Sequence, residues 1–162
     1  MYKYEICKFS DLSDEDINTL YGLNLGNDGE MRALVEQYNK NRSNYRRDLT
    51  ITICRNRLKK IIGWATIYKN THIGVFVHPR YRKKGIGSTL VEMMVDNSKN
   101  RQIICSPWSV AGYTLYTHAA EKKQLKRFRI YNSPIYDAEK HELIKGLLNE
   151  SKKNKNIQIV DL

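Results

Sequence analysis

The sequence predicts a single α/β domain, and three observations support this prediction. Short segments rich in β-branched residues alternate with longer segments whose apolar residues recur at helical spacing. The 162 residues suffice for one domain with a hydrophobic core, and no internal repeat, linker or low-complexity segment interrupts them. The element order, β-α-α-β-β-β-α-β-α-β, is that of an α/β arrangement over residues 1–162.

The N-terminal part is expected to hold a strand followed by two helices. Residues 2–9 alternate apolar and charged side chains, which is typical of a short strand. Ser13, with Asp16 three residues later, resembles a capping box and predicts a helix over residues 14–25. Residues 30–47 have apolar side chains on one helical face and a basic far end, which predicts a second helix.

Three strands and a helix are expected next. Residues 49–54 are rich in β-branched side chains, and residues 61–68 and 71–77 continue this pattern after intervening turns. Pro79 ends the third of these strands. Apolar residues then recur at helical spacing over residues 85–97, which predicts a helix with one buried face.

The C-terminal part repeats this alternation of strands and helices. We expect a strand over residues 102–105, a helix over 109–122, a strand over 127–131, a helix over 137–149 and an edge strand over 156–160. No apolar run is long enough to span a membrane, and the N-terminus does not resemble a signal peptide.

The formal net charge of +11 favours an anionic partner, such as nucleic acid, a phosphorylated cofactor or an acidic protein. A basic solvated surface explains the same charge equally well, because charge reports on steering and solubility rather than on function. The cysteines, Cys7, Cys54 and Cys105, lie far apart without metal-ligand spacing. We therefore expect free thiols, no metal site and a reducing, cytoplasmic location.

The stretch HPRYRKKGIGSTLVEMMVD joins the third of the central strands to the helix that follows it. A helix start offers unpaired N–H groups and the positive end of the helix dipole, and is therefore an anion site. Gly85 and Gly87 let the backbone approach a phosphate closely. The motif is neither a Walker P-loop nor the dinucleotide fingerprint G-x-G-x-x-G. The stretch therefore predicts a pyrophosphate cradle, with added positive charge from Arg82, Lys83 and Lys84.

The wider context, VFVHPRYRKKGIGSTLVEMM, resembles the acetyl-CoA-binding motif of the GNAT N-acetyltransferase superfamily. Residues 82–87 match the family pattern Q/R-x-x-G-x-G/A, and the preceding V-x-P and Tyr81–Arg82 pair match its common form. The element order over most of the chain also agrees with the family. The resemblance implies a GNAT fold, with a central mixed, mostly antiparallel sheet of about six to seven strands flanked by helices. It also implies that the sheet splays between its fourth and fifth strands.

The resemblance further implies a site for acetyl-CoA, the expected co-substrate. Backbone amides of residues 82–87 would hold the pyrophosphate, and the strand of residues 75–77 would pair with the pantetheine arm. Gly74 suits this role, because a glycine inside a strand often marks a bulge or a close backbone approach. The expected cofactor-binding residues are Val75, Phe76, Val77, Arg82, Lys83, Lys84, Gly85, Ile86, Gly87, Ser88 and Ser109.

A general acid for the departing thiolate is expected on the helix after the fifth strand. The family often uses a tyrosine within N-x-x-A-x-x-L-Y, and the matching segment here reads SVAGYTLY, with Ser109 in place of the asparagine. The resemblance therefore implies Tyr116 as the acid, with Tyr113 as the fallback. The competing interpretation is that Tyr116 only packs in the core.

The general base is less directly indicated. Family members often use a glutamate near the fourth strand, but no carboxylate occurs between Asp48 and Glu92. His72 is the candidate catalytic base, because an imidazole titrates near neutral pH. His78, within V-H-P, is expected to be structural. An amine that is already neutral would need little help from a base.

We thus expect an acyltransferase that passes the acetyl group of acetyl-CoA to a primary amine by direct attack in a ternary complex. The acceptor stays open between a small amine, a protein amine and a nucleic-acid-linked amine. The sequence has basic clusters with interleaved aromatic residues, and such clusters would suit binding of a nucleic acid. The alternative is a catalytically inactive GNAT-fold module that binds nucleic acid. A homodimer is the default expectation for this family.

Overall fold

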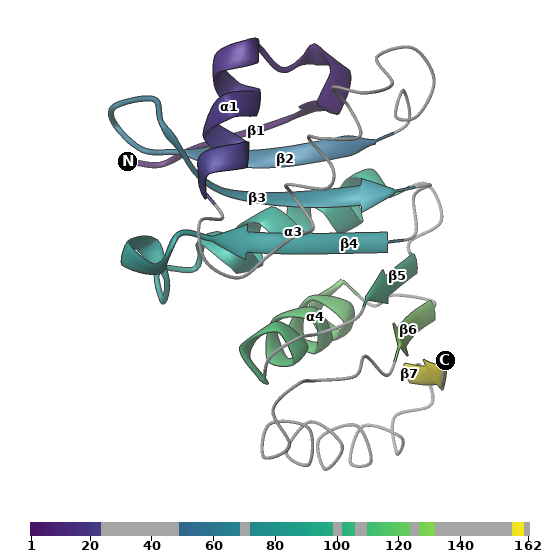
Figure 1. The fold of residues 1–162 in the computed structure, drawn as a ribbon. Coiled ribbons are helices and arrows are strands. Elements are labelled where there is room, and N and C mark those ends of the chain that lie inside the picture. The colour runs from purple at the N-terminus through teal and green to yellow at the C-terminus, as the bar shows by residue number, and fades with distance from the viewer. Residues whose placement is uncertain are drawn as a thin grey trace.

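The computed structural model describes residues 1–23, 49–68, 72–98, 102–105, 110–123, 127–131 and 157–160. These residues form one seven-stranded sheet in the order β1-β2-β3-β4-β5-β6-β7, with three helices, α1, α3 and α4 (Figure 1). The helices predicted over residues 30–47 and 137–149 lie outside the described residues.

The first half of the sheet is antiparallel, as predicted. It comprises β1 (Lys3–Lys8), β2 (Thr50–Arg55), β3 (Ile61–Tyr68) and β4 (His72–Val77), each paired with the next. Isoleucine, threonine and valine recur along β2, β3 and β4, and such β-branched side chains fit the pleated surface of a sheet.

The second half of the sheet is parallel, so antiparallel pairing is less extensive than expected. β5 (Gln102–Cys105), β6 (Arg127–Tyr131) and β7 (Ile157–Val160) pair in parallel with one another, and β5 also pairs in parallel with β4. Parallel neighbours need long crossover connections. The helices α3 (Ile86–Asn97) and α4 (Val110–Lys122) supply the first two of these connections.

The contact between the two halves of the sheet is short. β4 and β5 are paired at one position, His72 with Ile104, whereas β3 and β4 are paired at six. Gly74 keeps regular register with Thr66 of β3, so the bulge suggested by this glycine is absent from that ladder. The register shift lies instead between β2 and β3, at Cys54 and Arg55.

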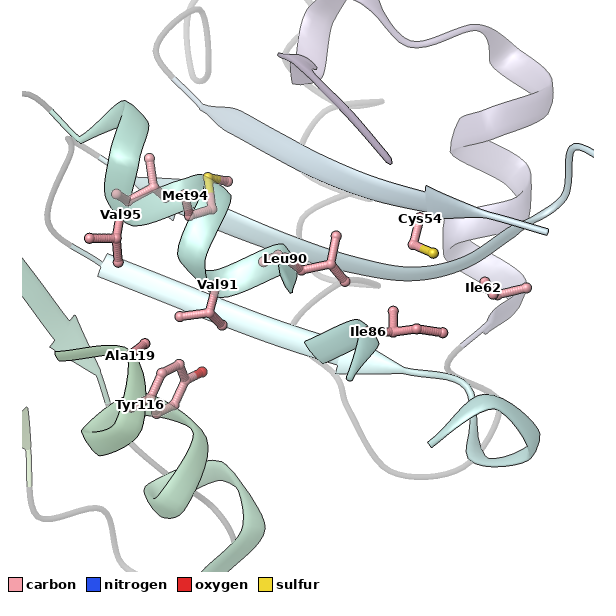
Figure 2. Packing of buried hydrophobic residues seen from close by; sticks show 11 residues of the cluster. Cys54, Ile62, Ile86, Leu90, Val91, Met94, Val95, Tyr116 and Ala119 are labelled. Atoms are coloured by element: carbon pink, nitrogen blue, oxygen red, sulfur yellow. The ribbon is translucent and has the colours of Figure 1, made fainter. Parts of the chain in front are cut away.

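The core has two layers, one on each face of the sheet. The helices α3 and α4 cover a cluster that comprises Cys54, Ile62, Ala65, Ile67, Ile86, Leu90, Val91, Met94, Val95, Tyr116 and Ala119 (Figure 2). The helix α1 (Asp14–Leu23) covers the opposite face, where Phe9, Ile17, Leu20, Leu49, Ile51, Ile53, Ile61 and Trp64 are buried. Thus α1 and α3 lie on opposite faces of the sheet (Figure 1).

Two features fix α3 and the sheet together. The buried hydroxyl of Thr52 lies 3.3 Å from the carbonyl oxygen of Leu90 on α3 and 3.4 Å from that of Ala65 on β3. Gly63 lets α3 approach closely, because an added Cβ would lie 3.1 Å from the carbonyl oxygen of Phe76 and 3.2 Å from Leu90 Cδ1. The start of α3 is therefore held in a fixed position relative to the end of β4.

The helix α1 is joined to the sheet by charge. Arg55 on β2 donates two hydrogen bonds, of 2.7 and 2.8 Å, to the carboxylate of Asp16 and a third, of 3.1 Å, to Glu5 on β1. The Ser13 hydroxyl accepts a 3.2 Å bond from the Asp16 amide, which confirms the predicted helix cap.

Candidate active site

A short turn connects β4 to α3, and we call residues 79–85 the cradle turn. Pro79–Tyr81 form one turn of 3₁₀-helix. His78 caps it, because its Nδ1 accepts a 3.3 Å hydrogen bond from the Arg80 amide and its carbonyl accepts a 2.8 Å bond from the Tyr81 amide. The structural role predicted for His78 is therefore confirmed.

The start of α3 presents unpaired amides. Gly85 is its N-cap in the left-handed conformation, with φ of 74°, and provides no side-chain cap. The Thr89 amide bonds the Gly85 carbonyl at 3.0 Å, which leaves the amides of Ile86, Gly87 and Ser88 without partners inside the helix. These donors and the helix dipole together suit an anion.

The two glycines of the motif serve different needs. No atom lies within 4 Å of a Cβ added at Gly85, so its requirement is conformational, and any L-residue would be strained at this φ. An added Cβ at Gly87 would contact Leu115 at 3.5 Å and Val77 at 3.6 Å, which are ordinary packing distances. Alanine is therefore compatible with position 87, in line with the pattern Q/R-x-x-G-x-G/A.

Arg82 is held by the strand that precedes it. Its Nε donates a 2.9 Å hydrogen bond to the Val77 carbonyl, and its guanidinium lies 5.9 Å from the centre of the Phe76 ring. Its backbone amide donates to the Pro79 carbonyl at 3.2 Å. That amide therefore already has a partner, unlike those at the start of α3.

The backbone N–H and C=O groups of successive residues in β4 point alternately toward β3 and toward the opposite, open side of the strand. The His78 amide donates to Ile62 on β3 at 2.9 Å, so every second residue back along the strand faces β3. Val75 and Val77 face the other way, and the bond from Arg82 to the Val77 carbonyl agrees with this direction. Of the three predicted strand residues, Phe76 therefore directs its backbone groups to β3 rather than to the open side.

Tyr116 lies inside the core, and 5% of its surface is exposed. Figure 2 shows it on α4 together with Ala119, on the side that faces α3 near Val91. Leu115, the residue before it, lies against Gly87 at the start of α3. The helix that carries Tyr116 is thus packed directly on the first turn of α3, and the tyrosine itself is a member of the core cluster.

Three further predicted site residues are His72, Ser109 and Tyr113. His72 occupies the first position of β4, where it pairs with Tyr68 of β3 and Ile104 of β5. Ser109 lies outside the described residues, directly before α4. Tyr113 is on α4, and its side chain also lies outside the described part of the chain.

Sequence reasoning missed the contacts of Tyr81. Its hydroxyl lies 3.3 Å from Nδ2 of Asn56 in the β2–β3 turn, and its ring packs edge-on against Tyr2 and His78. The Nζ of Lys84 lies 5.6 Å from the centre of the same ring. The one local signal was Asn56, since asparagine often closes a turn with its side chain.

The described residues offer neither a metal-binding cluster nor a membrane-spanning helix. Within the described ranges, no group of three or more histidine, cysteine or acidic residues is arranged to hold a metal ion. The helices in those ranges are too short or too polar to cross a membrane. Cys7 and Cys54 are both free thiols.

Comparisons with known proteins agree with this geometry. Residues 15–122 match the model of the acetyltransferase (GNAT) family. The chain is similar in structure to mutant forms of the spermidine/spermine N-acetyltransferase SpeG from Vibrio cholerae, with a TM-score of 0.51 and 17% identity over 75% of this chain and 78% of that one. It is also similar to a predicted acetyltransferase from Clostridium acetobutylicum solved with acetyl-CoA, with a TM-score of 0.51 and 18% identity over 73% and 88% of the two chains. Among curated proteins, a search by sequence gave no match.

Proposed function

The chain belongs to the acetyltransferase (GNAT) family, and on that premise we propose that it transfers the acetyl group of acetyl-CoA to a primary amine by direct attack in a ternary complex. As a member of this family it is an acyltransferase with acetyl-CoA as co-substrate. The observation that carries the proposal is the glycine-bearing start of α3, where the amides of Ile86, Gly87 and Ser88 have no partner inside the helix.

The residues around this helix start fit the pyrophosphate of the coenzyme. Amide donors and the helix dipole point to one place, and the space beside Gly85 is open. Lys83 and Lys84 add exposed positive charge to the cradle turn. Arg82 contributes differently, because its side chain and its amide are bound to Val77 and Pro79.

The pantetheine arm would lie along the open side of β4. Val75 keeps its amide and carbonyl on that side, and Val77 keeps its amide, since its carbonyl accepts from Arg82. The single paired position between β4 and β5, at His72, supports a splay of the two strands beyond this point. We propose that the thioester enters this splay.

Two side chains would move protons. Bound acetyl-CoA supplies an activated thioester, which the acceptor nitrogen attacks at its carbonyl carbon while the carbon–sulfur bond breaks. Tyr116 would donate its hydroxyl proton to the departing sulfur, and the location of α4 beside Gly87 supports this role. His72 would take the proton lost by the amine, which its position at the β4–β5 contact supports.

The acceptor class is the open part of the proposal. A net charge of +11 disfavours a polycationic acceptor and is compatible with an amine linked to a polyanion, such as aminoacyl-tRNA. Small amines and protein amines are the other candidate acceptors. The reducing, cytoplasmic location and the homodimer predicted from the sequence belong to this proposal as well.

Calorimetric titration with acetyl-CoA tests the proposal directly. Wild type should bind in the micromolar range typical of enzyme substrates. Gly87→Asp should abolish binding, because it adds a negative charge and bulk in the first turn of α3, whereas the matched control Gly87→Ala should bind nearly as wild type. Coenzyme A release should then identify the acceptor from a panel of spermidine, a lysine peptide and aminoacyl-tRNA. Absence of acetyl-CoA binding to wild type would overturn the proposal.

A further inference from the structure

The turn between β2 and β3, residues 56–60, lies directly beside the cradle turn. It is held in one conformation by Asn56, whose Oδ1 accepts hydrogen bonds of 3.0 and 3.1 Å from the amides of Leu58 and Lys60. Two backbone bonds between Asn56 and residues 59 and 60 close the same turn, and Lys59 adopts a left-handed φ of 61°. The turn is therefore ordered before any ligand arrives.

Tyr81 connects this turn to the cradle. Its hydroxyl accepts a 3.3 Å hydrogen bond from Asn56 Nδ2, and its ring carries the Lys84 ammonium at 5.6 Å. One side chain thus contacts both the β2–β3 turn and the last cation before Gly85. The two loops consequently present their charges at the same end of the sheet.

The cations of these loops have no acidic partners among the described residues. Two carboxylates near the end of β2, Glu5 and Asp16, are bound to Arg55, and Glu5 also to Lys3. The described ion pairs include none of the seven exposed cations of the two loops, which are Arg57, Lys59, Lys60, Arg80, Arg82, Lys83 and Lys84. Seven like charges gathered without an ion pair to any described residue favour a multiply charged anion.

The same surface carries an apolar tip. Leu58 is 77% exposed between Arg57 and Lys59, and it is one of three large hydrophobic residues exposed in the described part of the chain. An exposed aliphatic side chain flanked by cations suits a ligand with both a flat apolar ring and a phosphate. The nucleotide end of coenzyme A, an adenosine with a 3′-phosphate, has this chemistry.

We propose that residues 56–60 form a second part of the coenzyme site and bind the adenosine 3′-phosphate. The protein thereby selects coenzyme A thioesters over acetyl donors that lack this phosphate. This inference rests on the proposed function, since the coenzyme must first be held by the start of α3. Tyr81 is the positioning residue that keeps the β2–β3 turn against the cradle.

The test compares coenzyme A with dephospho-coenzyme A by calorimetry. Wild type should bind coenzyme A about tenfold more tightly, as one charge-assisted contact allows. Arg57→Gln/Lys60→Gln should reduce this preference to about twofold or less while affinity for the dephospho form changes little. The control Lys8→Gln removes an exposed positive charge at the opposite end of β1 and should keep the preference.

Tyr81→Phe is a second test variant, and it leaves the charge of the protein unchanged. Loss of the hydroxyl contact with Asn56 should weaken binding of coenzyme A more than binding of the dephospho form, with an unchanged melting temperature. Equal binding of both nucleotides to wild type, or an unaltered preference in Arg57→Gln/Lys60→Gln, would overturn this proposal alone. Failure of wild type to bind either nucleotide would overturn the proposed function as well.

Discussion

Arg82 donates its Nε to the carbonyl oxygen of Val77 at 2.9 Å and so ties the cradle turn to the end of β4. The guanidinium also lies 5.9 Å from the centre of the Phe76 ring, on the same strand. The arginine of the motif therefore bonds to protein through its side chain and does not simply add a free charge beside the phosphate site. It fixes where the turn leaves the strand.

Replacement of Arg82 should separate this bonding role from that of charge. Arg82→Ala should weaken acetyl-CoA binding about tenfold or more, because the loss of one charge-assisted hydrogen bond is of this size. Arg82→Gln should restore most of the affinity, since a glutamine amide also donates to a carbonyl and the family pattern accepts glutamine. Calorimetry on both variants measures this order, and equal affinities for the two would contradict it.

Tyr116→Phe should separate catalysis from packing. The phenyl ring keeps the contacts with α3, so acetyl-CoA affinity and the melting temperature should stay close to wild type. The turnover number should fall about a hundredfold, which is the usual worth of a positioned general acid. The measurements are kcat by coenzyme A release and Kd by calorimetry. An unchanged kcat would assign Tyr116 to the core alone.

Gly63→Ala should destabilise the fold, whereas Gly87→Ala should not. The added Cβ at Gly63 meets the Phe76 carbonyl at 3.1 Å, and that backbone atom cannot rotate away. Overpacking of this kind costs about 1–3 kcal/mol. At Gly87 the contacts are 3.5 and 3.6 Å, at ordinary packing distance. Urea unfolding of the two variants should therefore differ, and equal stabilities would contradict the close packing around Gly63.

Elements with strong local periodicity were predictable from the sequence. The strand at Ile61–Tyr68 was predicted with its observed bounds, and the helix at Ile86–Asn97 differs from its prediction by one residue, because Gly85 proves to be the cap. The turn from β4 into α3 was predictable, since its glycines and its helix are adjacent in the chain. Its free amides follow from the helix start alone.

Features that depend on partners distant in sequence could not be predicted. Periodicity predicts strands near residues 102–105, 127–131 and 157–160, but it does not predict which strands they pair with. Their parallel pairing depends on the crossover connections between them. The bond from Asn56 to Tyr81 joins residues 25 apart and leaves no local pattern. The burial of Tyr116 similarly depends on α3, with which α4 packs only in the folded chain.

The ion pair between Arg55 and Asp16 should make stability depend on acid pH. The Arg55 guanidinium lowers the pKa of Asp16 below its ordinary value of 3.8. Because the folded pKa is the lower one, the stabilisation is fully present above pH 3.8 and is lost as the pH falls through the folded pKa. Asp16→Asn should therefore cost about 2 kcal/mol at neutral pH, the worth of hydrogen bonds to a charged group. The cost should shrink as the pH falls below about 4.

The control for this prediction is Asp14→Asn. Asp14 occupies the first turn of the same helix, is exposed, and belongs to none of the ion pairs between described residues. It therefore reports only the interaction of a carboxylate with the helix dipole, worth about 0.3–1 kcal/mol. Urea unfolding of wild type and both variants from pH 7 to pH 3 gives the comparison. A cost for Asp16→Asn that equals that of Asp14→Asn, or that stays constant with pH, would show that the ion pair with Arg55 does not stabilise the fold.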